Sequence, residues 1–425
     1  MTGNVLAPDA VAPLHGSAAT AVAWRWRGQL HVTVIVKASF AFAPEAVMPR
    51  IEPQPVVLTE VHHGKNPTRS VRFTSEIAPH LGRADVLFTG FAEAALGAPV
   101  RSLGVRVAVY TEQRSLLDKH LVVQEKAGFE RMPIVYERAD RGAEGLENPF
   151  GIDPSSGPPG IVDPAQPDRP AGFGPIARTW PTRKRLLGAT PRKALDAAIA
   201  EVPEGFDWTY YQAAPLDQRT EFLAGDEWIL LEGLHPTLPR LQTRLPSARA
   251  SARIFGLAGA PEGHRIELTA DMLHIDGDEQ RCTVVWRKSF PVAAEAALPA
   301  LRIAAGAEIG NEALPWPDPR VAWPSRAALS NDAAVDDIAA TLVVRGGGGA
   351  ETVALASSPL VSRPQATLPF QPSSGAAIAP SAVAGERAPA SPTDTLALSP
   401  EQMPPAAPSA ALPWGTLALT PEASA

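Results

Sequence analysis

Cysteine is almost absent from this chain, since Cys282 is the only one among 425 residues. A single thiol excludes an internal disulfide framework and is typical of proteins that work in a reducing compartment. Cys282 falls on a strand-like run beside Val284, where a lone cysteine usually packs as a small hydrophobe. A nucleophile would need a neighbouring base, and the sequence offers no obvious one. We therefore expect Cys282 to be buried and unreactive.

The chain also lacks an excess of positive charge and any long apolar run. It carries 38 Lys and Arg against 45 Asp and Glu, which gives a net charge of −7. That balance argues against nucleic acid as a partner, because phosphate contacts need clustered cations. No apolar stretch reaches transmembrane length, and residues 1–13 lack a basic region followed by an apolar run. We expect a cytoplasmic protein that makes no membrane contact.

Motifs for metals and phosphates are missing as well. The one adjacent histidine pair is His62-His63, and neighbours on a strand point to opposite faces, so the two are poor joint ligands. The glycine run at 346–349 lacks the Lys-Ser/Thr pair that a phosphate loop requires. We therefore expect neither a metal site nor a cofactor.

Alternating apolar residues are what the sequence does have. Residues 20–42 predict a hairpin, because Val22, Trp24 and Trp26 alternate with other residues before a turn at 27–29. Short strands separated by turn residues are typical of sandwiches, so we predict a mainly β fold with antiparallel, sandwich-like sheets and few short helices. The other predicted strands are residues 86–91, 100–110, 116–123, 228–231, 250–257, 265–269, 272–275 and 282–290.

The last two of these strands form the clearest hairpin, closed by the turn sequence Asp276-Gly277-Asp278. Leu273 and Ile275 alternate on one arm, and Val284 and Trp286 alternate on the other. We therefore expect Trp286 to lie in the core.

Pro and Gly interrupt this β pattern in the middle of the chain. Within that segment, residues 191–201 predict a helix, because Pro191 suits a first helical turn and Leu195, Ala198 and Ile199 have helical spacing. The predicted organisation is an N-terminal β-rich lobe (1–127), a turn-rich middle segment (128–220), a C-terminal β-rich lobe (221–345) and a tail (346–425).

The tail is rich in Ala, Pro and Ser and poor in charge, so its sequence predicts disorder. A Leu-Pro-aromatic pattern nevertheless recurs, at Ala313-Leu314-Pro315-Trp316, Thr367-Leu368-Pro369-Phe370 and Ala411-Leu412-Pro413-Trp414. Proline pre-sets an extended backbone and the aromatic ring can serve as an anchor, so these copies are candidate protein-binding motifs. The candidate residues in the tail are Leu368, Pro369, Phe370, Leu412, Pro413 and Trp414, and chance recurrence is the alternative.

Several ordered blocks, which we call the signature blocks, combine turn residues with polar and apolar ones. They are Ala84-Asp85-Val86, the run 132–138, Glu147-Asn148-Pro149, the run 170–176, Ala213-Ala214-Pro215, Asp217-Gln218, Asp271 and the run 284–287. In their order they resemble the domain-of-unknown-function family numbered 2169, from about residue 15 to about residue 295. Members of that family are found in bacterial type VI secretion clusters.

The resemblance implies an adaptor or chaperone that binds a secreted type VI effector and helps to load it onto the spike (VgrG/PAAR-type) complex, and it does not imply a catalyst. One alternative is a structural component of the secretion apparatus. Another is a hydrolytic or carbohydrate-active enzyme with its site in the middle segment.

The enzyme hypothesis depends on a charged cluster in that segment, since paired carboxylates can do acid–base work. We favour a structural role, because irregular backbone needs polar partners and an Arg fork supplies them. The residues assigned this structural role are Tyr136, Glu137, Arg138, Glu147, Asn148, Pro149, Gly172, Phe173, Gly174 and Pro175.

Overall fold

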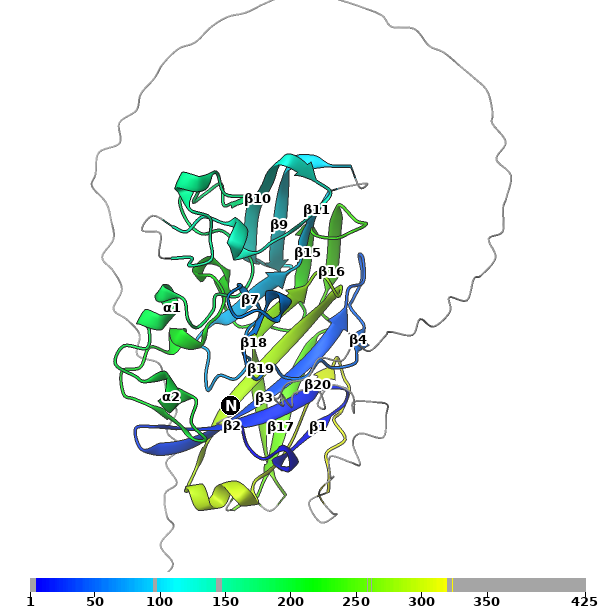
Figure 1. The fold of residues 1–425 in the computed structure, drawn as a ribbon. Helices are drawn as coiled ribbons and strands as arrows, with labels where there is room; N and C mark the ends of the chain where they lie inside the picture. Colours follow the sequence, from blue (N-terminus) through cyan, green and yellow to red (C-terminus); the bar gives the residue numbers. More distant parts are fainter. Residues whose placement is uncertain are drawn as a thin grey trace, which may run out of the picture. The chain divides into compact units, whose positions relative to one another are not determined.

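An eleven-stranded sheet forms the largest element of the fold (Figure 1). The computed structural model describes residues 5–94, 98–142, 147–257, 259–260, 262–318 and 323. By its internal contacts the chain divides into two units, Met1–Val344 and Arg345–Ala425, and all the described residues belong to the first.

The large sheet runs in the order β1-β20-β17-β18-β19-β3-β2-β13, with β4, β7 and β14 paired beside this path. Most neighbours are antiparallel, but β1–β20, β13–β2 and β18–β7 are parallel. The strands are β1 Val11–Leu14, β2 Ala18–Trp26, β3 Gln29–Ala41, β4 Arg50–Ile51, β7 Ala84–Thr89, β13 Ala200–Val202, β14 Arg219–Thr220, β17 Ala248–Phe255, β18 His264–Asp276, β19 Arg281–Val292 and β20 Arg302–Ile309.

A second sheet of five antiparallel strands has the order β12-β10-β9-β15-β16. Two further pairs, β11–β8 and β5–β6, stand apart from both sheets. The bounds are β5 Val61–His62, β6 Val71–Phe73, β8 Phe91–Glu93, β9 Val100–Tyr110, β10 Ser115–Phe129, β11 Arg131–Pro133, β12 Ile161–Val162, β15 Trp228–Glu232 and β16 Arg240–Arg244.

One hydrophobic core joins the two sheets, which confirms the predicted mainly β, sandwich-like architecture. Val36 and Trp286 enter this core from the large sheet, and Val107 and Leu231 enter it from the five-stranded sheet. Trp286 is 2% exposed, as expected from its alternation with Val284. Residues of all three predicted segments before the tail contribute to this core, while the exact segment boundaries stay a prediction.

Both predicted hairpins form. β2 and β3 pair across the turn at Arg27 and Gly28, and β18 and β19 pair with Leu273 opposite Val284. The runs 265–269 and 272–275 are, however, one continuous strand, β18, with a bulge at Asp271. A bulge changes the direction of a side chain, and here it allows the Asp271 carboxylate to reach Arg287 inside the protein.

The predicted helix over 191–201 is wrong for most of its length. Only α2 (Arg192–Leu195) is helical, and Asp196 already leaves the helical conformation. The chain then turns into β13, where Ala200 pairs with Trp24 of β2. Local spacing favours a helix here, but pairing with the edge of the large sheet overrides this weak local preference.

The remaining helical elements are short. They are α1 Pro181–Arg185 and the 3₁₀ turns η1 Pro8–Ala10, η2 His63–Lys65, η4 Tyr136–Arg138, η5 Pro154–Ser156, η6 Trp208–Tyr211, η7 Leu216–Gln218 and η8 Glu295–Ala300. Within the described ranges, no helix is long and apolar enough to cross a membrane.

Candidate functional site

Signature blocks that lie far apart in the sequence meet at Asp85, on the fully buried strand β7. The Asp85 carboxylate accepts hydrogen bonds from the backbone N–H of Ala213 at 2.6 Å and of Ala214 at 3.1 Å, and from the Gln212 side chain at 3.2 Å. Burial raises the pKa of Asp85, and the two backbone donors oppose that shift. Asp85 therefore fixes the segment after η6 against the large sheet.

Gln218 makes the second connection, from η7. Its Nε2 donates to the carbonyl oxygens of Val86 at 2.8 Å and Phe173 at 2.9 Å, while its Oε1 accepts from Lys119 Nζ at 2.9 Å. One buried amide thus joins β7, β10 and the Gly-Pro block at 170–176. Blocks that are distant in the sequence thus contact one another in the folded protein, so their ordered set, and not any single motif, is characteristic of the fold.

Lys119 enters this network from β10 and is almost completely buried. Its ammonium contacts Gly172 O at 2.9 Å, Gln218 Oε1 at 2.9 Å and Asp217 Oδ2 at 2.8 Å. Burial lowers the pKa of Lys119, and the Asp217 carboxylate acts in the opposite direction. An ammonium has three N–H donors, so these three acceptors use all of them.

Tyr136 packs into the same region from η4. Its hydroxyl donates to Gly174 O at 3.1 Å, and its ring meets Trp180 edge to face at 4.8 Å between centroids. A Cβ on Gly172 would lie 2.7 Å from the Tyr136 ring, so the ring needs glycine there. Asn148 closes the turn by donating to Tyr136 O at 2.7 Å. Burial raises the pKa of the Tyr136 hydroxyl.

The charged residues of the middle segment find separate partners and do not form one cluster. Glu137 accepts from Ser70 N at 2.8 Å and Ser70 Oγ at 2.7 Å, which lowers the pKa of Glu137 although burial opposes this. Arg138 meets Glu125 at 3.4 Å on a partly exposed face. Of the other predicted residues, Phe173 and Pro175 are buried, whereas Pro149 is exposed. The six candidate residues of the tail lie outside the described residues.

A pocket of about 370 Å³, which we call the signature pocket, opens beside this network. Leu216 of η7 lies at the pocket and is 80% exposed, and Asp217 is also partly exposed, whereas Pro215 before them and Gln218 after them are buried. The lining residues are Lys119, Tyr136, Glu147, Asp163, Gln166, Arg169, Pro170, Ile176, Trp180, Thr182, Pro215, Leu216 and Asp217.

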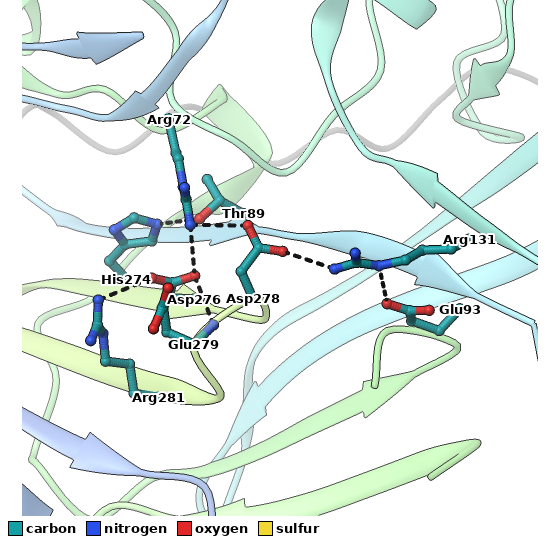
Figure 2. Close-up of polar contacts among 9 residues, drawn as sticks. All are labelled: Arg72, Thr89, Glu93, Arg131, His274, Asp276, Asp278, Glu279 and Arg281. Carbon is teal, nitrogen blue, oxygen red and sulfur yellow. Dashed lines mark hydrogen bonds and ion pairs between the residues drawn. The ribbon is translucent and has the colours of Figure 1, made fainter. Parts of the chain in front are cut away.

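A second polar network lies at the turn between β18 and β19 (Figure 2). Arg72 reaches Asp278 at 3.0 Å and Asp276 at 3.7 Å, and Arg281 approaches Asp276 at 3.5 Å. Arg131 lies 3.5 Å from Asp278 and 2.9 Å from Glu93, and it thereby extends the network to Glu93. The sequence identified the turn but contained no signal for this network, since Arg72 and Arg131 come from the distant strands β6 and β11.

His274 lies beneath this network and is almost completely buried. Its Nε2 hydrogen-bonds with Thr89 Oγ1 at 2.9 Å (Figure 2). Burial, with a smaller contribution from the nearby cations Lys37, Arg72 and Arg281, lowers the pKa of His274 to about 3. The imidazole is therefore neutral at physiological pH.

A pocket of about 310 Å³ opens beside His274, between the large sheet and the segment 54–59. Lys37 lines it, but its ammonium is already bound by Glu76 at 2.7 Å and by Pro55 O at 3.2 Å. Asp276 also lines the pocket, and it is engaged by two arginines. Apolar side chains such as Val56, Leu58 and Phe73 also line this recess, and the charged groups around it already neutralise one another.

Chemistry based on Cys282 or a metal finds little support in the part of the chain that the structure describes. Cys282 is completely buried, and burial together with nearby Asp276 raises the pKa of its thiol. Among the described residues, no group of three His, Cys, Asp or Glu side chains is placed to hold a metal ion.

Comparison with known proteins gives one match. No curated protein and no solved structure matches this chain. The family model described as an uncharacterized protein conserved in bacteria, DUF2169, matches residues 27–287, which include all the signature blocks. The chain therefore belongs to the domain-of-unknown-function family 2169.

Proposed function

We propose that the protein is an adaptor that binds a type VI secretion effector and helps to load it onto the spike complex. The context is the expectation, stated with the sequence, that members of this family occur in type VI secretion clusters. The observation that carries the proposal is Leu216, an apolar side chain that is 80% exposed beside the signature pocket.

Single exposed leucines are common on protein surfaces, so the surroundings of Leu216 decide the argument. The two residues after it are anchored, Asp217 by Lys119 at 2.8 Å and Gln218 by three hydrogen bonds, and Pro215 before it is buried. The turn is thus held in place before any partner arrives. A fixed apolar anchor loses little conformational entropy on binding, and such anchors supply most of the energy of protein interfaces.

The enzyme alternative receives less support from the same pocket. A catalytic lysine or tyrosine needs a free donor or lone pair directed at substrate. Here Lys119 contacts three protein acceptors, and the Tyr136 hydroxyl donates to Gly174 O. These groups stabilise the middle segment, which is the role that an adaptor scaffold requires.

Co-purification tests the proposal with the tagged full chain and with the effector and spike proteins encoded beside its gene. The expected result is a complex that contains one effector and a spike protein. Recovery of sheath or baseplate proteins without an effector would instead support the alternative of a structural component.

Leu216→Asp should remove the effector or the spike protein from this complex without changing the melting temperature. Val47→Asp is the matched control, because Val47 is also apolar and is 54% exposed. Equal binding by both variants and the unmodified chain would overturn the role of Leu216, and equal loss from both variants would show that the effect is not specific to this surface.

A further inference from the structure

The first Leu-Pro-aromatic copy lies within the described residues, and it is docked on the large sheet. Leu314 is buried in a small apolar cluster with Leu14, Phe255 and Ala304. Trp316 packs against this cluster from outside. We call the surface formed by Leu14, Phe255, Ala304, Arg253 and Arg265 the Leu-Pro-Trp site.

Two arginines hold the aromatic ring of this copy. The guanidinium carbon of Arg253 lies 5.0 Å from the centroid of the Trp316 ring, and that of Arg265 lies 5.7 Å from it. Both distances fall within the range of cation–π attraction, which is strongest for tryptophan. Arg265 is itself positioned by Glu308 at 3.4 Å.

The depth of the Leu-Pro-Trp site depends on Gly306, which has no side chain. A Cβ on Gly306 of β20 would lie 3.1 Å from Leu314 Cδ2 and 2.7 Å from Leu14 O. Glycine at this position lets β1 pair closely with β20 and leaves room for the leucine above. The site thus recognises a leucine and a tryptophan two residues apart, with proline between them.

The same four residues recur in the tail, since Ala411-Leu412-Pro413-Trp414 is identical to Ala313-Leu314-Pro315-Trp316. We propose that the Leu-Pro-Trp site binds segments of this sequence, and that residues 411–414 of a second copy of this chain are its alternative occupant. When identical segments are exchanged between molecules, the same contacts form again, so association requires no new interface.

Residues 411–414 of a second molecule must compete with residues 313–316 for the Leu-Pro-Trp site. Residues 313–316 follow β20 directly, so their effective concentration at the site is high and they occupy it in an isolated molecule. The incoming segment binds when the local copy is removed, or when many copies of the chain gather in one assembly. The copy at 367–370 carries Phe370 in place of tryptophan and should bind less tightly.

Two full-length proteins test the inference in solution. The receiver carries Leu314→Ser and Trp316→Ser, which remove the local copy, together with Leu412→Ser and Trp414→Ser, which remove its own distal copy. The donor is the unmodified chain with a fluorophore at its N-terminus, and a matched control donor carries Leu412→Ser and Trp414→Ser. Fluorescence anisotropy then measures binding of each donor to the receiver.

Saturable binding of the donor is expected, and binding of the control donor should be at least about tenfold weaker, because both anchors are lost. Arg253→Ala and Arg265→Ala in the receiver should weaken donor binding in the same way. Equal binding of the two donors, or binding of neither, would overturn the proposal.

A second measurement applies if the receiver does not unfold cooperatively. A peptide of residues 408–417, with a photoreactive benzophenone in place of Trp414, is irradiated with a chain that carries only Trp316→Ser, which weakens binding of the local copy. Cross-links to β17 or β18 that excess natural peptide suppresses support the proposal. Cross-links at other places, or cross-links that a scrambled peptide suppresses equally well, overturn it.

Discussion

Two polar networks of this protein differ in how much water they meet. The network around Asp85, Lys119 and Gln218 is enclosed, and its side chains bond chiefly to backbone groups of distant segments. The network at the β18–β19 turn joins arginines to carboxylates, and Arg131 in it is 54% exposed (Figure 2). A buried polar group that is left unpaired lowers the free energy of unfolding, whereas an ion pair exposed to water adds little to it.

We therefore expect the enclosed network to be needed for the fold, and the network at the turn to have a smaller effect on stability. The enclosed network joins signature residues such as Asp85 and Gln218 to Lys119, which lies outside the signature blocks, and it holds a turn-rich segment in one conformation. The open network contains residues that no sequence pattern marked. Substitutions in the two networks should therefore have effects of different size and different dependence on salt and pH.

Asp85→Ala should cause the largest loss. The change leaves the N–H groups of Ala213 and Ala214 buried without an acceptor, and we expect the free energy of unfolding to fall by about 2–4 kcal/mol. Urea denaturation measures this. Asp85→Asn is the control, because its amide oxygen keeps one acceptor and should restore part of the loss. A fully stable Asp85→Ala protein would show that the enclosed network does not hold the fold.

Gly172→Ala tests the packing of the same network. The added Cβ would meet the Tyr136 ring at 2.7 Å, and such overpacking typically lowers stability by about 1–3 kcal/mol. Gly174→Ala is a close control two residues away, because its Cβ would meet nothing nearer than 3.8 Å. Thermal melting of the two variants should separate them clearly, and equal melting temperatures would contradict the geometry.

His274 links the open network to the interior and should make stability depend on pH. Its pKa is about 3 in the folded protein, against about 6.5 in the unfolded chain. The unfolded chain therefore takes up a proton first, and stability falls as the pH drops below about 6.5.

Between pH 7 and pH 5.5 the unmodified chain should lose about 1 kcal/mol more than His274→Gln, which cannot titrate. Chemical denaturation at the two pH values measures this difference. The raised pKa values of Asp85, Asp271 and Asp276 act in the opposite direction in both proteins, so the comparison isolates the histidine. Identical pH dependence in the two proteins would show that His274 titrates normally.

Sequence patterns predicted the two hairpins because their information is local. Residues 20–42 and the pairing of Leu273 with Val284 follow from a period of two and a turn. The helix over 191–201 failed because its final residues pair instead with Trp24, about 175 positions away. The spacing of apolar residues within a short segment carries no information about such a distant pairing partner.

The candidate site shows the same limit. The order of the signature blocks identified the residues, but it could not show that Asp85 bonds to Ala213 or that Gln218 bonds to Phe173. Nor did it mark Leu216, whose importance lies in being exposed on a turn whose other residues are anchored. Contacts between segments more than 40 residues apart depend on how the sheets pack, and a single sequence does not record that packing.

Arg131→Ala should have the smallest effect, since the Arg131 side chain is 54% exposed and water reaches its ion pairs with Glu93 and Asp278 from that side. Exposed pairs of this kind contribute about 0–1 kcal/mol, and the stacking of Arg131 on the Phe91 ring, at 3.5 Å, adds a part that salt does not screen strongly. The variant should lose less stability relative to the unmodified chain in 1 M salt than in 0.01 M salt, because the Debye length shrinks from about 30 Å to about 3 Å.

Denaturation at the two salt concentrations measures this change, with Arg131→Lys as the control that keeps the charge but not the planar guanidinium. If Arg131→Ala lost as much stability as Asp85→Ala at both salt concentrations, the turn network would be as important to the fold as the enclosed one. The distinction between the two networks would then fail, because exposure to water would no longer predict what a polar contact contributes.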